Sequence, residues 1–208
     1  MCEVNGKILI STAYLPPVSY FSPISGADEI LIEREENYLK QTYRNRCCIL
    51  SAHGPQSLTV PVLLGSIHKT RLKDIRIDYS KRWQQVHIGA ITASYGSAPY
   101  FQFYNEKIKK VISGNYQFLL DLNMELLTLL LEYLKINKSV TYTTEFEKIV
   151  SSSHDFRNIF SPKKEPDFKV KPYLQVFENE NGFVPHLSII DLIFNMGPDA
   201  DKYIQAAI

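Results

Sequence analysis

The chain has 208 residues and is 45% hydrophobic, so it is long and apolar enough to bury a core and is not expected to be disordered. Its 23 Lys and Arg residues balance 22 Asp and Glu residues, which excludes a global positive field that would draw it onto nucleic acid or an anionic membrane. Any site for an anion must therefore be local. We expect no nucleic-acid partner and no membrane insertion.

The start of the chain and its cysteines indicate a compartment. Residues 1–7 lack the basic stretch, apolar run and cleavage site of a secretory signal. Cys2, Cys47 and Cys48 are an odd set that includes an adjacent pair, and adjacent cysteines rarely form an unstrained bridge. These features predict reduced thiols in a cytoplasmic protein with one domain spanning residues 1–208.

Short apolar and β-branched runs characterise the first part of the chain. Runs of this kind, bounded by Gly and Pro, predict strands, and residues 18–24 between the first two have helical spacing. The turn His53-Gly54-Pro55 predicts that the runs on either side of it form a hairpin. The predicted strands are residues 7–11, 29–33, 47–50, 57–62 and 75–79.

From residue 81 the hydrophobic period becomes helical. In the most apolar stretch, 118–134, acidic residues interrupt the leucines, which predicts a buried helix and argues against a membrane span. The predicted helices are residues 81–95, 100–112 and 116–135.

The last part of the chain begins with weak periodicity. Residues 151–172 are rich in Ser and Pro, which predicts a flexible loop, and a return strand at 173–177 and a helix at 188–196 follow. The Ser188-x-x-Asp191 spacing predicts a capping box at that helix. The pattern as a whole predicts an α/β or α+β domain, with a mixed sheet and helices that come mainly from the middle of the chain.

The segment 38–46 is the first candidate for a working surface. Lys40, Arg44 and Arg46, with Asn45 between the two arginines, are donors that suit a phosphate or a carboxylate. A solvated strand edge beside the acidic run at 33–36 is the alternative, and spacing alone favours it.

Two other residue types could perform chemistry. His87 lies one helical turn after Trp83, where a neutral imidazole could act as a general base or serve as a structural residue. Cys47 follows Arg46, so a thiolate nucleophile for acyl transfer is a further hypothesis, although we expect Cys48 at least to be buried and inert. No histidine has the spacing of a closed zinc site, and we expect neither a metal nor a cofactor.

Several motifs together resemble one protein family over nearly the whole chain. They are Tyr14-Leu15-Pro16, Tyr38-x-Lys40-x-x-Tyr43-Arg44-Asn45-Arg46, Trp83-x-x-x-His87 and Leu187-Ser188-Ile189-Ile190-Asp191-Leu192. In this order they resemble the WbqC-like protein family. Many of its members begin with His-Gln-Pro-x-Tyr-Leu-Pro, whereas this chain has Ser11-Thr12-Ala13 before Tyr14. A role for a histidine at that start is therefore not transferred.

The resemblance implies a transferase-like enzyme of bacterial surface-polysaccharide (O-antigen) biosynthesis that modifies an activated amino sugar, with acyl or aminoacyl transfer as the candidate chemistry. Under this interpretation the small-molecule substrate is a nucleotide-linked sugar. Lys40, Arg44 and Arg46 hold its diphosphate or another anionic group, and Asn45 and Tyr38 orient it. The alternative is a non-catalytic protein that binds a sugar nucleotide or assists assembly.

The remaining roles follow from the same resemblance. Tyr14 is a further substrate-binding residue, His87 accepts a proton, and Asp191 orients a base or contacts sugar hydroxyls. Replacing Arg44 by Ala is then expected to abolish turnover with little change in melting temperature. The sequence does not indicate an oligomeric state.

Overall fold

The computed structural model describes residues 6–63, 70–150, 153–163, 168 and 170–206. Its main sheet has four parallel strands in the order β5-β2-β1-β6. The strands are β1 (Lys7–Ser11), β2 (Glu29–Glu33), β5 (Ser139–Tyr142) and β6 (His154–Asp155). Alternate residues of the central strands β1 and β2 point into the core, where Ile8, Ile10, Ile30 and Ile32 are at most 1% exposed.

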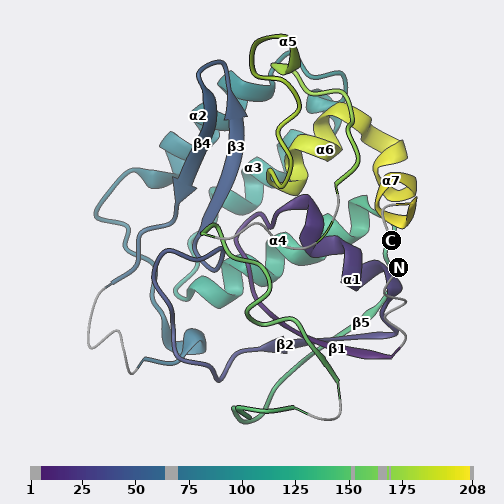
Figure 1. The fold of residues 1–208 in the computed structure, drawn as a ribbon. Coiled ribbons are helices and arrows are strands. Elements are labelled where there is room, and N and C mark those ends of the chain that lie inside the picture. Colours follow the sequence, from purple (N-terminus) through teal and green to yellow (C-terminus); the bar gives the residue numbers. More distant parts are fainter. Residues whose placement is uncertain (1–5, 64–69, 151–152, 164–167, 169, 207–208) are drawn as a thin grey trace.

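A separate antiparallel hairpin contains β3 (Arg46–Ser51) and β4 (Gly54–Thr59). The turn between them uses Gly54 at a φ of 100°, a conformation that glycine adopts without a steric penalty. In Figure 1 the parallel sheet and the hairpin lie toward opposite ends of the molecule, with helices between them.

Helices fill the space between these two units. They are α1 (Phe21–Gly26), α2 (Trp83–Tyr95), α3 (Phe101–Ile112), α4 (Leu119–Tyr133), α5 (Glu178–Asn181), α6 (Ile189–Met196) and α7 (Ala200–Ala206), with short 3₁₀ turns η1 (Val18–Tyr20), η3 (Leu72–Asp74) and η4 (Gly197–Asp199). Helix α4 is the most apolar of the longer helices, and α2 packs against β3. Among the described residues, no helix is both long and apolar enough to cross a membrane.

The predicted α/β fold is confirmed, and both strand directions occur, in separate sheets. Strands β1 and β2 have the predicted bounds, and the hairpin and the three central helices are present with ends shifted by a few residues. The loop predicted at 151–172 contains the short strand β6. Within that segment, residues 151–152, 164–167 and 169 lie outside the described residues.

Three local predictions are wrong. Residues 173–177 form no strand, because the Gln175 side chain pairs with both backbone groups of Val184, at 3.0 and 2.9 Å, in place of a strand ladder. The segment 75–79 makes only isolated bridges. The predicted capping box at α6 is absent, because the Ser188 hydroxyl donates to the Leu15 carbonyl at 2.9 Å and does not cap the helix.

Candidate functional site

The β3–β4 hairpin has one apolar and one polar face. Inward-pointing Cys47 and Ile49 are fully buried, whereas the outward residues Arg46 and Cys48 are partly exposed. In the antiparallel register Arg46 lies opposite Thr59. Strand alternation therefore gathers the polar side chains of both strands on the outer face.

Two adjoining cavities meet at Thr59, the last residue of β4, and we call them together the hairpin groove. The base cavity, of about 490 Å³, is lined by Tyr38, Lys40, Gln41, Asn45 and Arg46 together with residues 59–63, Asp78 and Lys81. The helix cavity, of about 460 Å³, is lined by residues 56–59, Pro61, Lys81, Arg82, Trp83, Val86 and His87. Thr59, Pro61 and Lys81 line both cavities, so the two share a wall.

The groove is locally cationic in a chain whose net charge is only +1. Lys40, Arg46, Lys81 and Arg82 line it, against the single carboxylate of Asp78. Hydrogen bonds from Ser80, with Lys81 nearby, lower the pKa of Asp78, so that it is charged at neutral pH. Among the residues that the structure describes, none of the four cations forms an ion pair.

Two polar side chains in the wall of the base cavity suit the recognition of a ligand. The Asn45 amide nitrogen donates to the Val60 carbonyl at 2.9 Å, but its buried Oδ1 has no partner within the described parts of the chain. Burial raises the pKa of Tyr38 to about 12, so its phenol keeps its proton near neutral pH. An unpaired buried oxygen is costly, which makes Asn45 a candidate for a contact that forms only when a ligand is bound.

His87 lies in the wall of the helix cavity and is 3% exposed. Its Nδ1 is 2.8 Å from the Tyr14 hydroxyl, and the ring also hydrogen-bonds the backbone of Thr59. Burial lowers the pKa of His87 to about 4, so the imidazole is neutral at pH 7 and accepts the Tyr14 proton in a hydrogen bond. Tyr14 itself is fully buried and does not line the groove.

Arg44 points away from the groove, although it lies only two residues before Arg46. Its guanidinium donates to both oxygens of Glu36, at 2.8 and 2.6 Å, and to the Ser11 hydroxyl at 2.9 Å. Arg44 is 4% exposed, so this ion pair is shielded from water. The structure therefore separates the two arginines of the 38–46 segment between two sites.

Arg44 belongs to an ionic cluster at the carboxyl ends of β1, β2 and β6 that is buried except for Asp155, and we call it the buried ionic cluster. Its members are Glu33, Glu36, Arg44, Asp155 and Arg157. Arg157 donates to Glu33 at 3.0 Å and to Asp155 at 2.6 Å, and the bond to Asp155 lowers the pKa of that carboxyl. Each arginine in the cluster is neutralised by at least one carboxylate.

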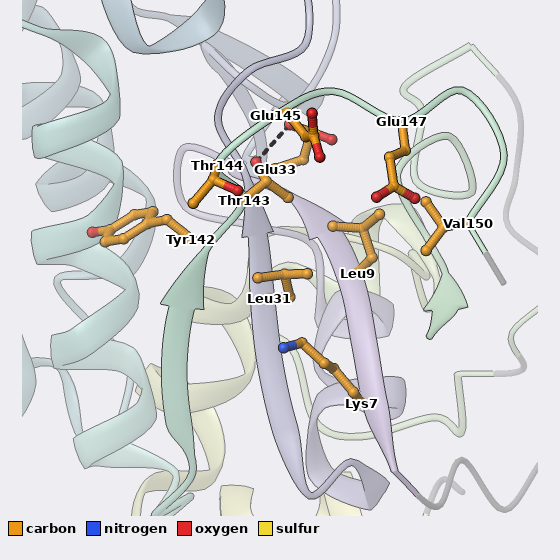
Figure 2. Close-up of a pocket in the computed structure, with 10 residues that line it drawn as sticks. All are labelled: Lys7, Leu9, Leu31, Glu33, Tyr142, Thr143, Thr144, Glu145, Glu147 and Val150. Carbon is orange, nitrogen blue, oxygen red and sulfur yellow. Dashed lines mark hydrogen bonds between the residues drawn. The ribbon is translucent and has the colours of Figure 1, made fainter. Parts of the chain in front are cut away.

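A further cavity, of about 230 Å³, opens beside this cluster on the outer face of the sheet. Figure 2 shows Glu33 and Thr143, joined by a 2.8 Å hydrogen bond, at the carboxyl end of β2, with Leu9 and Leu31 lower on the strands. Its lining has three glutamates and one cation, Lys7, which pairs with Glu29 at 3.1 Å. This cavity therefore does not suit an anion.

Asp191 and the cysteines lie elsewhere. Asp191 is fully buried and accepts hydrogen bonds from Tyr173 at 2.6 Å and Gln175 at 2.9 Å, and burial raises its pKa.

Burial also raises the pKa of the Cys47 thiol, which disfavours thiol catalysis there. Cys48, expected to be buried and inert, is only partly buried, because the strand register turns Cys47 inward, although burial also raises the pKa of the Cys48 thiol.

Comparison with known proteins identifies the family. The family model described as "WbqC-like protein family" matches residues 12–162, which is more than half of the chain. The chain belongs to the WbqC-like protein family. It is also 23% identical, over 95% of its length and 96% of the relative's, to "Uncharacterized protein Rv1507c" of Mycobacterium tuberculosis. No solved structure matches the chain significantly.

Two of the WbqC-like motifs connect different parts of the fold. The Tyr-Leu-Pro motif directly follows β1, and Leu15 adopts a φ of 42°, which is unusual for a bulky side chain. Its Tyr14 reaches His87, and its Leu15 carbonyl accepts from Ser188, so the motif connects α2 with the start of α6. Of the Arg-Asn-Arg motif, Asn45 and Arg46 line the groove, whereas Arg44 joins the ionic cluster.

Sequence reasoning missed three groove residues of this WbqC-like chain: Asp78, Lys81 and Arg82. A usable signal was present. Lys81 and Arg82 are the first two residues of the predicted helix 81–95, where acidic residues are usually favoured because the helix dipole is positive at that end. Two cations at such a position add to the positive charge at the amino end of the helix.

Proposed function

We propose that the hairpin groove binds the diphosphate of a nucleotide-linked sugar, and that the protein is a transferase-like enzyme that modifies an amino sugar for a bacterial surface polysaccharide. The observation behind the proposal is the group of four groove cations that lack ion-pair partners among the described residues. Family membership supports the pathway and the class of substrate. We propose further that residues 1–208 act as one domain.

The base cavity supplies the groups that a diphosphate needs. Lys40 and Arg46 provide positive charge, and an Arg guanidinium forms paired hydrogen bonds with phosphate oxygens. Tyr38 is a neutral phenol that donates to an anionic oxygen, and the free Oδ1 of Asn45 accepts from a sugar hydroxyl or amide. The cations and the phenol suit the diphosphate of a nucleotide-linked sugar, and the Asn45 oxygen suits its sugar.

For transfer chemistry, we propose His87 as the proton acceptor. Its low pKa keeps the imidazole neutral at pH 7, as a base requires, although a base with a pKa of about 4 is weak. To act, the ring must give up its hydrogen bond with Thr59 and move its proton to Nδ1, where the Tyr14 oxygen accepts it, so that Nε2 presents a lone pair to the substrate. Tyr14, which holds Nδ1, orients the ring without touching the ligand.

A non-catalytic sugar-nucleotide-binding or assembly protein is the second candidate. One observation favours it: His87 and Asp191 are both buried and hydrogen-bonded, so neither is presented to the groove as a free base. Asp191 lines neither cavity of the groove, and we propose for it a structural role at α6. Binding without turnover is the outcome that separates the two candidates.

The test begins with binding. Isothermal titration calorimetry with UDP-glucose is expected to show saturable binding that weakens roughly tenfold in Lys40→Gln and in Arg46→Gln. Lys110→Gln, on the outer face of α3, is a matched control and should leave the affinity unchanged. Higher salt should weaken binding, since exposed charges are screened. Unchanged affinity in both groove variants would overturn the proposed site.

Turnover is tested in two cultures of one bacterial strain, one expressing the wild-type gene and the other the Arg46→Gln gene. Mass spectrometry of the nucleotide-sugar pool is expected to show a modified amino sugar only with the wild-type gene. Binding in vitro together with an unchanged pool would reject the transferase and leave the binding protein.

A further inference from the structure

The amino end of helix α2 opens into the helix cavity. The cavity lining includes residues 81–83 and Val86, which are the last residues before α2 and its first turn. No acidic residue lies in the first turn, and no side chain caps the helix. Within the described residues, the backbone amides of residues 83–85 have no hydrogen-bond partner, as is usual for uncapped first-turn amides.

A second feature of the same cavity points to a ligand. Trp83 lines it and is 5% exposed, yet its buried Nε1–H has no hydrogen-bond partner within the described parts of the chain. A buried indole N–H normally finds an acceptor. Within the described residues, the first-turn amides and the Trp83 indole N–H thus all lack acceptors at this end of α2, beside the cations of Lys81 and Arg82.

The amides, the indole N–H and the two cations at this end of α2 favour a negatively charged, hydrogen-bond-accepting ligand atom. All of them are donors or positive charges, and the helix dipole adds partial positive charge at the same point. The lining of the helix cavity contains no carboxylate. A cationic group would therefore be repelled there, whereas a carboxylate would find donors on several sides.

We propose that the helix cavity is a second anion subsite, which takes a carboxylate on the sugar part of the ligand. The proposal rests on the proposed function, in which the base cavity holds the diphosphate. Lys81 lines both cavities and lies between the two anionic groups, where it reduces their repulsion. The preferred ligand is then a nucleotide-linked sugar that bears an acidic group, and Lys81, Arg82 and the amino end of α2 determine that preference.

The test compares two ligands that differ only in this group, UDP-glucuronate and UDP-glucose. Trp83 is the only tryptophan of the chain, so its fluorescence reports on the helix cavity. We expect UDP-glucuronate to bind about tenfold more tightly than UDP-glucose and to change the emission more, since hydrogen bonds to a charged group are among the stronger ones.

Two substitutions should remove the selectivity by different means. Arg82→Gln removes a cation, and Gln85→Glu places a negative charge in the exposed first turn of α2. The second change stabilises the helix through its dipole while it repels a carboxylate, so lost selectivity in Gln85→Glu cannot be attributed to unfolding. Lys110→Gln serves again as the control and should keep the tenfold preference.

Each outcome decides a different point. Equal affinities for the two ligands in the wild-type protein would overturn the carboxylate subsite and leave the diphosphate site standing. A preference that survives both Arg82→Gln and Gln85→Glu would also overturn it, since the selectivity would then arise elsewhere. Failure of both ligands to bind would overturn the proposed function together with this inference.

Discussion

The hairpin groove and the buried ionic cluster each contain an arginine, and the two arginines differ in burial and in pairing. In the cluster, Arg44 is 4% exposed and both oxygens of Glu36 neutralise it. In the groove, Arg46 hydrogen-bonds Thr59 at 3.2 Å and has no ion-pair partner among the described residues. The guanidinium of Arg44 is therefore paired with a carboxylate of the protein, whereas the charge of Arg46 is not paired within the described residues and can pair with a ligand.

The comparison also shows where this fold does not place its anion site. In open α/β sheets, ligands often bind beyond the carboxyl ends of the strands. In this protein the ionic cluster occupies that region, and the lining of the cavity beside it includes three glutamates and one lysine (Figure 2). Four cations without an ion-pair partner among the described residues line the hairpin groove instead.

The largest expected effect comes from removing one partner of the buried pair. Glu36→Gln leaves the Arg44 guanidinium buried without a carboxylate, so the free energy of unfolding should fall by about 3–5 kcal/mol. Arg46→Gln in the groove should change it by less than about 0.5 kcal/mol. Urea denaturation of both variants measures the difference. Equal losses would contradict the contrast between the two regions.

The second effect concerns pH. Burial lowers the pKa of His87 to about 4, against 6.5 for an unperturbed histidine, so between these values the unfolded chain binds the extra proton. The stabilisation is complete above pH 6.5 and is lost as the pH falls toward 4, by up to about 3 kcal/mol. Denaturation at pH 4.5 and pH 7 should show a steeper change in wild type than in His87→Asn. Parallel curves would argue against a depressed pKa.

A smaller effect is expected at the edge of the ionic cluster. The Thr143 hydroxyl donates to Glu33 at 2.8 Å and is buried. Thr143→Val keeps the shape but removes this donor to a charged group, so the free energy of unfolding should fall by about 2 kcal/mol. Thermal denaturation measures the loss, and an unchanged melting temperature would show that Arg157 and the backbone satisfy Glu33 without Thr143.

The smallest effect is expected at an exposed pair. Lys107 and Glu132 are 2.8 Å apart, with side chains 59% and 62% exposed. Lys107→Gln should therefore change the free energy of unfolding by no more than about 0.5 kcal/mol, and less at high salt. Denaturant titration at two salt concentrations checks this value. A loss comparable to that of Glu36→Gln would show that burial does not distinguish the pairs.

The regular elements were largely predictable from the sequence because their residues repeat with the period of the structure. Strands β1 and β2 and the helices from α2 to α4 follow such patterns. Strand β5 was missed because its edge position leaves it mostly exposed, so it has no apolar alternation. The segment 173–177 was misassigned because its extended chain is held by the side chain of Gln175, and sequence alone does not reveal that choice.

The site was only partly predictable for a related reason. The sequence spacing grouped Lys40, Arg44 and Arg46 as one candidate site, but the direction of each side chain depends on where β3 begins. Because Arg44 lies just before the strand and Glu36 lies within reach, its charge turns inward. The expectation that Arg44→Ala leaves the melting temperature nearly unchanged is therefore reversed: we now expect a large loss of stability.

The most direct test measures stability and binding together for Arg44→Gln and Arg46→Gln. We predict that Arg46→Gln binds UDP-glucose about tenfold more weakly with nearly wild-type stability. Arg44→Gln should lose about 3 kcal/mol of stability and, while folded, bind within about twofold of wild type. If Arg44→Gln loses the ligand while remaining stable and Arg46→Gln binds normally, the assignment of the two arginines is contradicted.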